Sequence, residues 1–251
     1  MKIEVYSNIY NEEEILPYWL RHYETFVDRI FVWDCGSTDK TLEILKQHPK
    51  VTLLPLPSEE MSGLDDNYFI NYLYPQYKEY SRGVADWVII ADADEFIYHP
   101  QIKEVLGKAK SDGRQLVQCE GFSMVSSKFP TTKGQIYDEI KSGFSDRRYS
   151  KWTIFSPEVD ILFQRGRHWK PVGFENVKKN RDASIKLLHY RFVGRDYLES
   201  RTRKNIERFS LTKFNTNAWI NIDTPIICPN HETCPVLEWF DKYKDKGIDV
   251  I

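Results

Sequence analysis

Asp92-Ala93-Asp94 places two carboxylates one residue apart, directly after the apolar run Trp87–Ala91. Magnesium and manganese are hard cations that prefer carboxylate and phosphate oxygens, so this pair suits a metal bound to a nucleoside diphosphate. One carboxylate can face the metal while the other faces water or a ribose. The tripeptide also occurs by chance on exposed loops, and its position after an apolar strand is what favours a functional site. Glu95 either assists the pair or forms an ion pair with a nearby lysine.

A second polar cluster, Ser7–Glu14, follows the first expected strand. Asn8, Tyr10 and Glu12 are its candidate donor-binding residues, because small polar groups and one aromatic ring can hold a nucleotide base. The alternative is that Tyr10 belongs to the core and Asn11 only caps a helix.

A third cluster, Trp33–Asp39, follows the second expected strand. Asp34 or Asp39 could accept hydrogen bonds from a uracil imide or a ribose hydroxyl. Turn and capping chemistry explains Gly36, Ser37 and Asp39 equally well.

The elements that must position these clusters alternate between strands and helices. The strands are expected at Ile3–Ser7, Arg29–Trp33, Val51–Leu54 and Trp87–Ala91. The helices are expected from Ile15 to Val27, through Leu42 and Leu45, and over Tyr68–Tyr80, from the spacing of their apolar residues. Such alternation predicts an α/β fold with a mostly parallel, doubly wound sheet. In these sheets ligands bind beyond the carboxyl ends of the strands, where all three polar clusters fall.

The second half of the chain is less regular. Strands are expected at Leu116–Cys119 and Ile185–Tyr190, helices at Tyr197–Phe209 and Leu237–Tyr243, and acceptor-side loops over Ser123–Arg148. We expect a single domain over residues 1–251, with a nucleotide-sugar-binding half at 1–100. Residues 101–251 would form the acceptor-binding half and an irregular C-terminal wrap.

The three clusters, in this order and at this spacing, resemble the family 2 glycosyltransferases of the GT-A fold. The resemblance lies in a strand leading into Tyr10-Asn11-Glu12-Glu13, the turn Asp34-Cys35-Gly36-Ser37-Thr38-Asp39, and an apolar strand leading into Asp92-Ala93-Asp94-Glu95-Phe96. It covers the first hundred residues and continues faintly through Ser150–Trp152 and Leu188–Tyr190.

The resemblance implies a Rossmann-like GT-A domain whose mostly parallel central sheet is flanked by helices. It implies transfer of a sugar from a nucleotide-diphosphate sugar to a hydroxyl of a glycan or glycolipid, with inversion and with Mn²⁺ or Mg²⁺ as cofactor. Tyr10 would lie against the base, Asp34 near the base or ribose, Asp92 near the ribose, and Asp94 on the metal. Where the family often carries a second aspartate that contacts uracil, this chain has Cys35, a poor acceptor. The base therefore stays open, with a UDP-sugar as the favoured donor.

A late histidine completes the metal site in many enzymes of this fold, and His189 is the candidate because it ends a strand-like run. The expected metal ligands are thus Asp94, His189 and Asp92. Lys151 and Arg191 either neutralise phosphate or are solvated surface charges. His168 is expected to face the donor or acceptor sugar.

An inverting transfer needs a general base that deprotonates the acceptor hydroxyl. Glu120, expected at the end of a strand and followed by Gly121, is the first candidate. Its alternative role is to pair with a buried cation. Asp138, Asp160 and Glu175 remain further candidates.

Composition excludes several other classes. The formal net charge of −2 argues against a nucleic-acid partner. No run approaches the roughly 20 apolar residues of a membrane span, and no signal peptide precedes the first strand. Four scattered cysteines suit a reduced, cytoplasmic protein. The segment Cys228–Cys234 offers only three zinc ligands, whereas a structural site needs four.

The basic helix Arg195–Arg208 could touch anionic lipid as a peripheral contact, but Glu199 and Glu207 interrupt it, which favours a solvated face. A sugar-phosphate nucleotidyltransferase would carry a glycine-rich loop after the first strand, where this chain has Ser7–Glu12. A phosphatase with an aspartyl nucleophile would carry its pair of aspartates early in the chain, whereas Asp92 and Asp94 come late. The remaining alternative is a sugar- or nucleotide-binding protein that has the GT-A fold without turnover.

Overall fold

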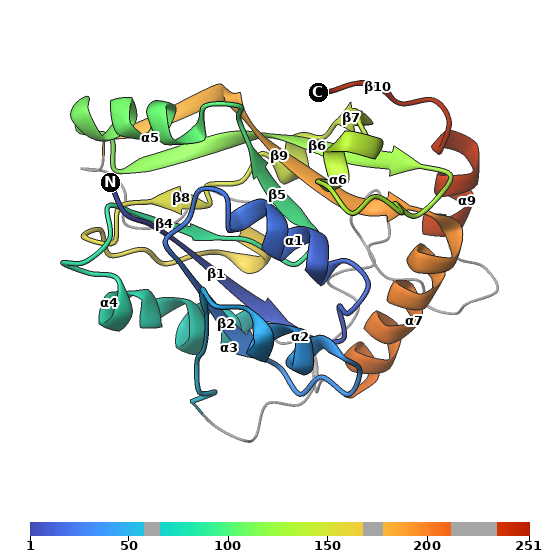
Figure 1. The fold of residues 1–251 in the computed structure, drawn as a ribbon, viewed down its shortest axis with the longest axis horizontal. Coiled ribbons are helices and arrows are strands. Elements are labelled where there is room, and N and C mark those ends of the chain that lie inside the picture. The colour runs from blue at the N-terminus through green and yellow to red at the C-terminus, as the bar shows by residue number, and fades with distance from the viewer. Residues whose placement is uncertain (58–65, 168–177, 212–234) are drawn as a thin grey trace. The chain divides into compact units, whose positions relative to one another are not determined.

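A computed structural model describes residues 1–57, 66–167, 178–211 and 235–251 (Figure 1). The chain divides into two compact units. The described part of unit 1 comprises residues 1–57, 66–122, 145–167 and 178–189. The described part of unit 2 comprises residues 123–144, 190–211 and 235–251. Two long strands, β6 (Leu116–Ser126) and β9 (Lys179–Val193), begin in unit 1 and end in unit 2.

Unit 1 is built on a parallel layer. Its strands are β1 (Ile3–Ile9), β2 (Arg29–Asp34), β3 (Val51–Leu53) and β4 (Trp87–Ile90), in the spatial order β3-β2-β1-β4. Every residue of β4 is buried, as expected for a strand covered on both faces. These strands confirm the positions predicted from the sequence.

Two helices connect β1, β2 and β3. They are α1 (Leu16–Tyr23) and α2 (Thr41–Gln47). The buried face of α1 contains Trp19 and Tyr23. The Tyr23 hydroxyl donates a hydrogen bond of 3.0 Å to the carbonyl of Glu95, so α1 is fastened to the start of β5 (Glu95–Tyr98).

The helix predicted over Tyr68–Tyr80 is present as short pieces. They are α3 (Asp66–Tyr68), a π-helical turn (Phe69–Leu73), a 3₁₀ turn (Tyr74–Gln76) and α4 (Tyr77–Tyr80). Pro75 has no backbone N–H, so a regular helical ladder cannot pass through it. The predicted apolar side is nevertheless buried, including Leu73, Tyr74 and Tyr77.

The rest of unit 1 adds antiparallel strands. β8 (Ile154–Phe155) pairs antiparallel with both β4 and β6, and β5 pairs antiparallel with β9. β4 therefore has the parallel neighbour β1 on one side and the antiparallel neighbour β8 on the other. β5 and the following α5 (Ile102–Ser111) are absent from the sequence-based prediction. Residues 95–98 form a strand because the apolar stretch after Glu95 pairs with the long β9.

Unit 2 contains more regular structure than predicted. Residues 123–148 were expected to be loops, yet they include the end of β6, a short α6 (Ile136–Glu139) and β7 (Ser142–Ser145). Hydrogen bonding by the strand backbone explains the difference, since β7 pairs antiparallel with β10 (Ile248–Asp249). The helices α7 (Arg195–Leu211) and α9 (Pro235–Tyr243) lie where helices were predicted and share an apolar cluster.

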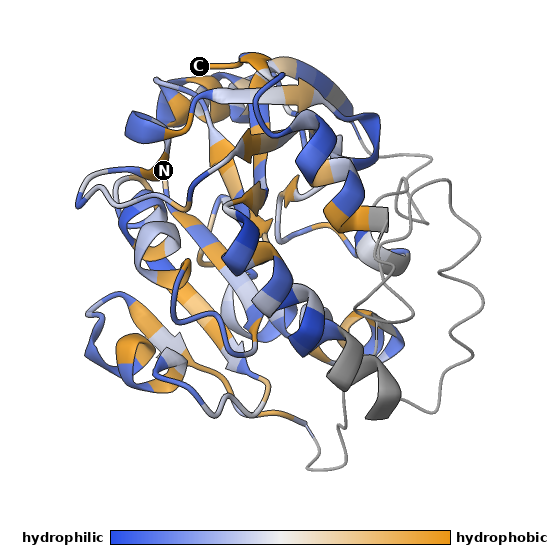
Figure 2. Cartoon of the chain, turned by 90° about the vertical axis from the view of Figure 1, so that its right-hand side faces the viewer, coloured by the Kyte–Doolittle hydropathy of each residue, from blue (hydrophilic) through white to orange (hydrophobic). Residues whose placement is uncertain are grey.

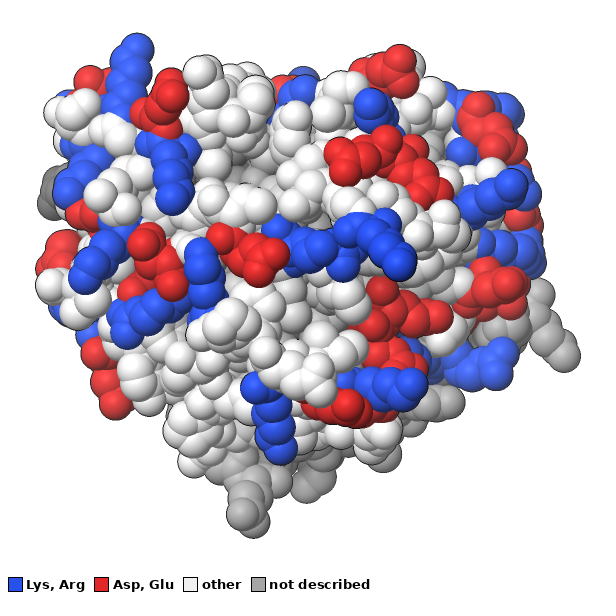
Figure 3. Space-filling model, viewed as in Figure 1, with Lys and Arg blue, Asp and Glu red and all other residues white. Residues whose placement is uncertain are grey.

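The distribution of residue types is that of a globular α/β protein. Hydrophobic residues run along the central strands, and the helices carry both hydrophobic and hydrophilic residues (Figure 2). Positive and negative side chains are interspersed over the face shown in Figure 3. Among the described residues, no helix is both long and apolar enough to cross a bilayer.

Candidate active site

The carboxyl ends of β1 and β4 meet at one edge of the sheet. In the parallel pairing of these strands, Tyr6 lies opposite Ile90. Asn8 therefore follows on β1 and Asp92 follows β4 at the same edge. This is the edge at which open α/β sheets bind their ligands.

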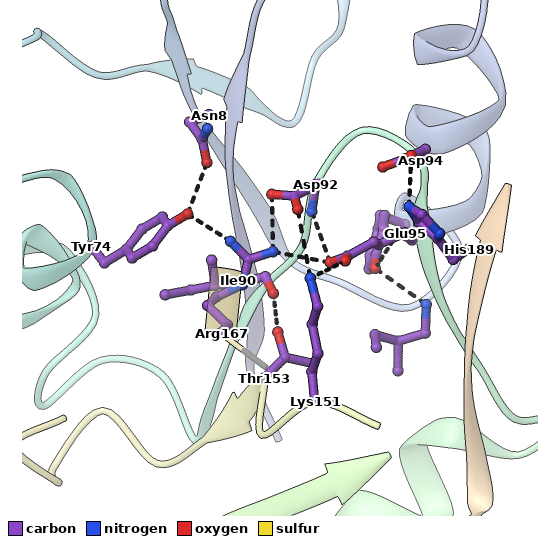
Figure 4. A network of polar contacts seen from close by, with 12 residues as sticks. Asn8, Tyr74, Ile90, Asp92, Asp94, Glu95, Lys151, Thr153, Arg167 and His189 are labelled. Atoms are coloured by element: carbon purple, nitrogen blue, oxygen red, sulfur yellow. Dashed lines mark hydrogen bonds and ion pairs between the residues drawn. The ribbon is translucent and has the colours of Figure 1, made fainter. Parts of the chain in front are cut away.

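Glu95 is the centre of a buried group of charges next to this edge (Figure 4). Its side chain is 1% exposed. Oε1 accepts a hydrogen bond of 2.5 Å from Nζ of Lys151, and Oε2 accepts one of 3.0 Å from Nη2 of Arg167. Burial alone would raise the pKa of Glu95, but the charges of Lys151 and Arg167 outweigh it and lower the pKa from 4.5 to about 2. Glu95 is therefore ionised at neutral pH.

Asp92 is the solvent-exposed member of this group, with 36% of its side chain exposed. Its Oδ1 lies 2.9 Å from Nη2 of Arg167, and its Oδ2 lies 3.8 Å from Nζ of Lys151. The backbone N–H of Asp92 donates to Oε2 of Glu95 at 3.2 Å. Two carboxylates thus neutralise two cations, one carboxylate buried and the other at the surface.

Arg167 links the charges to the end of β1. Its Nη1 donates to the hydroxyl of Tyr74 at 2.6 Å, and that hydroxyl donates to Oδ1 of Asn8 at 3.1 Å. Burial opposes the charge of Arg167, but Asp92 and Glu95 hold its pKa above the ordinary value. Arg167 has a left-handed backbone with φ 58°, next to Gly166 with φ 61°, a conformation that is uncommon for a non-glycine residue.

Lys151 is brought to Glu95 by a close contact with β6. The N–H of Cys119 donates to the carbonyl of Lys151 at 3.1 Å, and the N–H of Gly121 donates to Oγ of Ser150 at 3.1 Å. A Cβ atom at Gly121 would lie 2.2 Å from the carbonyl carbon of Tyr149. Only glycine allows the backbone to come this close.

Asp94 and His189 form a second, separate pair. Oδ2 of Asp94 lies 2.9 Å from Nε2 of His189, and both side chains are almost fully buried. The pair arises because Glu95 lies opposite His189 in the pairing of β5 with β9. The ring of Tyr149 stacks on His189, with 3.9 Å between the ring centroids. Nδ1 of His189 is buried and has no hydrogen-bond partner in the described part of the chain.

The Asp94–His189 pair fits a divalent cation as two of its ligands. A carboxylate oxygen and an imidazole nitrogen are suitable donors for Mn²⁺, and such sites commonly take their remaining ligands from substrate phosphates and water. Within the described part of the chain, no three His, Cys, Asp or Glu side chains are grouped to hold a metal. The predicted set of Asp94, His189 and Asp92 is therefore not assembled as three protein ligands, because Asp92 faces Arg167 instead.

The two turns after β1 and β2 are fastened to each other. Oδ1 of Asn11 accepts from the backbone N–H groups of Thr38 and Asp39, at 2.7 and 3.3 Å. The N–H of Asn11 donates to Oγ of Ser37 at 3.0 Å. Asp34 accepts from the N–H of Ser37 at 3.3 Å, which closes its own turn. The turn chemistry considered for Ser37 and Asp39 is thus present, and Oδ1 of Asp39 also accepts from the N–H of Thr41 at 2.9 Å. Asn11 does not cap α1, whose N-cap residue is Ile15, because its side chain is used by the turn after β2.

The family model for glycosyl transferase family 2 matches residues 7–166, which is more than half of the chain. The chain belongs to this family. The match includes all three polar clusters that suggested the family from sequence. The predicted GT-A class is confirmed, with a mixed central sheet whose first four strands are parallel.

Solved structures similar to this family 2 chain include TarS from S. aureus. The crystal structure of TarS has 15% sequence identity and a TM-score of 0.46, and the similarity covers 87% of this chain but 41% of that one. A structure of TarS 1-349 in complex with UDP-GlcNAc has 13% identity and a TM-score of 0.45, over 87% of this chain and 69% of that one. This chain thus spans less than half the length of the first of these structures. No curated protein matches the sequence significantly.

The remaining predicted residues of this family 2 chain lie in different places. Tyr10 and Glu12 are half-buried in the turn after β1. Glu120 is half-buried within β6 rather than at a strand end, because that strand continues to Ser126. Within the described ranges, the side chain of Glu120 forms no ion pair and no hydrogen bond with another side chain. His168 and Glu175 lie outside the described residues, and Arg191 is buried in unit 2.

Arg167 and Tyr74 are site residues that the sequence analysis missed. Arg167 lies in an irregular segment without apolar periodicity, and Tyr74 was assigned to a helix only as a buried side chain. The Gly166-Arg167 pair was the available local signal, since glycine often marks an unusual backbone conformation. Lys151, considered either as a phosphate ligand or as a solvated charge, is 2% exposed and therefore not a surface charge.

Proposed function

We propose that this chain is a glycosyltransferase that moves a sugar from a nucleotide-diphosphate sugar to a hydroxyl of a glycan or lipid-linked acceptor. Family membership supports the reaction type. The observation that carries the proposal is the grouping of Asp92, Lys151 and the Asp94–His189 pair after the buried strand β4. These groups can hold a diphosphate and its cation where the sugar departs.

A divalent cation, Mn²⁺ or Mg²⁺, is part of the proposal. When bound, it would neutralise the negative charge that develops on the departing nucleoside diphosphate. Asp94 and His189 would hold it through one oxygen and one nitrogen. Asp92 would face the ribose. Tyr10 and Asp34, in the turns after β1 and β2, would face the base, for which uracil is the favoured candidate.

The transfer is proposed to invert the configuration at the sugar carbon, with Glu120 as the general base. Glu120 is half-buried and has no cationic partner in the described part of the chain, so its oxygens are available for an acceptor hydroxyl. Asp160 is 74% exposed and paired with Lys78 and Arg82, which makes it a poor candidate. Asp138 caps α6 through the N–H of Gln135. Glu120→Gln should abolish transfer while leaving donor affinity within about twofold.

The direct test of the function is a panel of UDP-, GDP-, ADP-, CDP- and dTDP-sugars. Thermal stabilisation and hydrolysis of each donor would be measured with Mn²⁺, with Mg²⁺ and with a chelator. We expect one donor class to raise the melting temperature and to be hydrolysed slowly in a metal-dependent manner. The proposal fails if no nucleotide sugar stabilises the protein under any of these conditions.

Asp94→Asn tests the cation site on the donor identified by that panel. We expect donor affinity in the presence of Mn²⁺ to fall by about 10- to 100-fold, since the substitution weakens one of two protein ligands. Asp160→Asn is the matched control, because it removes an exposed carboxylate far from any role in the proposal. Stabilisation by the donor without any turnover would favour the non-catalytic binding protein instead.

A further inference from the structure

Lys151 and Arg167 are two buried cations whose counter-ions differ in their exposure to solvent. Each side chain is 2% exposed. Among the described residues they pair with two carboxylates, of which Glu95 is buried with them. The other, Asp92, is 36% exposed. Buried cations need compensating anions, and this pair receives half of its compensation from a carboxylate that solvent can reach.

We propose that Lys151 and Arg167 are a clamp for the donor diphosphate, that Asp92 is the exchangeable counter-ion of this clamp, and that Glu95 is its positioning residue. The inference rests on the proposed function, because it assumes a nucleotide-diphosphate donor. In the absence of donor, the Asp92 carboxylate lies against both cations. When the donor binds, phosphate oxygens take this place and Asp92 turns toward the ribose.

The chemistry of the two cations suits a diphosphate. Arginine presents a planar fork of donors that matches phosphate oxygens, and lysine adds a compact charge. Arg167 uses Nη2 for both Glu95 and Asp92, while its buried Nε has no hydrogen-bond partner among the residues that the structure describes. In a low-dielectric setting, fixed donors of this kind stabilise negative charge that develops on a leaving group.

Glu95 would act through the clamp rather than on the substrate. One of its oxygens holds Lys151, and the other holds Arg167 together with the backbone N–H of Asp92. Its side chain is 1% exposed and contacts both cations at 2.5 and 3.0 Å, so it fixes the direction of both side chains. The left-handed backbone of Arg167 supports the same reading, because strained conformations persist where neighbouring contacts determine them.

A purely structural ion cluster is the alternative, and the selectivity of binding separates the two. The nucleoside diphosphates UDP, GDP, ADP, CDP and dTDP, and the corresponding nucleosides, would be titrated calorimetrically into wild type, Arg167→Gln and Arg82→Gln. Arg82 is the control, because it also pairs with an aspartate, Asp160, at 2.8 Å but is 35% exposed.

For the nucleotide that wild type binds, we expect Arg167→Gln to lower the affinity for the nucleoside diphosphate by about 10- to 100-fold, because charge-assisted hydrogen bonds are lost. The affinity for the nucleoside should stay within about twofold of wild type. Arg82→Gln should change neither. If wild type binds no nucleoside diphosphate, the proposed function itself fails. If wild type binds a nucleoside diphosphate and Arg167→Gln prefers it over the nucleoside by the same factor as wild type, only the clamp is overturned. Should Arg167→Gln fail to fold, Arg167→Lys retains the charge without the fork and is expected to lose about 10-fold in diphosphate affinity.

Binding of inorganic pyrophosphate in a chelating buffer tests whether phosphate oxygens replace the Asp92 carboxylate at the two cations. This probe has no nucleobase, and the chelator removes metal ions. Asp92→Asn removes the competing carboxylate, so pyrophosphate should bind several times more tightly than to wild type, and Arg167→Gln in the same background should abolish the gain. Unchanged or weaker binding to Asp92→Asn would overturn the counter-ion role. In the variant Glu95→Asp the shorter side chain cannot reach both cations. We therefore expect it to lose affinity for the nucleoside diphosphate and to keep its affinity for the nucleoside.

Discussion

The turns after β1 and β2 and the loop after β4 lie at strand ends of the same parallel layer, but different forces hold them. The turns are joined by hydrogen bonds between short polar side chains and backbone N–H groups, as between Asn11 and Thr38. The loop after β4 is held by full charges, including Glu95, Lys151 and Arg167. One region is therefore shaped by turn chemistry and the other by buried ion pairs.

The difference also lies in how far apart the partners are in the chain. Asn11 and Thr38 are separated by 27 positions, whereas Glu95 is 56 positions from Lys151 and 72 from Arg167. The turns can form as soon as β1 and β2 pair. The charged loop requires β6, β8 and the segment before residue 168 to be in place. A region that binds a charged donor thus depends on the completed fold, while the region proposed to face the base is locally determined.

The largest effect should come from removing the buried carboxylate. Glu95→Gln leaves Lys151 and Arg167 without their buried counter-ion, and we expect the free energy of unfolding to fall by about 3–5 kcal/mol. Urea denaturation at neutral pH measures this directly. Asp39→Asn is the matched change in the turns, where the oxygen that accepts from the N–H of Thr41 can be kept, and its cost should be about 1 kcal/mol or less. Equal losses for the two variants would erase the distinction between the regions.

Acid should weaken the β5 side of the molecule through two groups. The pKa of Glu95 is lowered from 4.5 to about 2, so its stabilisation is complete above pH 4.5 and is lost as the pH falls toward 2. Burial of His22, whose Nε2 lies 3.0 Å from the carbonyl of Ile97, lowers its pKa from 6.5 to about 3. The unfolded state therefore binds a proton at His22 at a higher pH than the folded state does, and the free energy of unfolding falls as the pH drops below 6.5.

Urea midpoints measured across this range separate the two groups. Between pH 6.5 and 4.5 the wild type should lose up to about 3 kcal/mol through His22, at about 1.4 kcal/mol per pH unit. His22→Gln should flatten this interval and leave the fall below pH 4.5. Glu95→Gln should leave this interval unchanged and make the fall below pH 4.5 shallower, where His22 still contributes down to about pH 3. A fall between pH 6.5 and 4.5 that survives in His22→Gln would show that another group is responsible.

Gly121→Ala should disturb the charged region through its backbone. The added Cβ would lie 2.2 Å from the carbonyl carbon of Tyr149, so the segment carrying Lys151 must move away from β6. We expect a loss of about 1–3 kcal/mol, as for other overpacked sites. Gly107→Ala is the control, since no atom lies within 4 Å of its added Cβ and α5 should gain about 0.5–1 kcal/mol. A loss of equal size in both variants would contradict the role given to Gly121.

The same contrast explains what the sequence could reveal. β1, β2, β4 and the first two helices follow from apolar periodicity and turn residues, which are properties of neighbouring positions. The turn roles of Ser37 and Asp39 were among the alternatives for the same reason. β5 was missed because Glu95–Tyr98 is a short run whose partner, β9, lies about ninety positions further along the chain.

The site residues divide in the same way. Asp92, Asp94 and His189 were selected because strand ends and a family resemblance mark them. Arg167 was missed, because its role depends on Glu95, Asp92 and Tyr74, which are all distant in sequence. Nothing in the composition of residues 165–167 distinguishes a buried arginine from an exposed one.

The smallest effect should come from the turns themselves. Asn11 has φ 52°, and its Oδ1 accepts from the N–H groups of Thr38 and Asp39. Asn11→Gly keeps this backbone conformation without strain but removes the acceptor, so we expect a loss of about 0.5–1.5 kcal/mol in the free energy of unfolding. Asn11→Asp retains an acceptor and should lie close to wild type. Both variants should bind the preferred nucleoside within about twofold of wild type, because Asn11 supports the turn rather than the ligand. If Asn11→Gly lost nucleoside affinity and kept its stability, Asn11 would be a binding residue, and the two regions would differ less than their hydrogen bonds indicate.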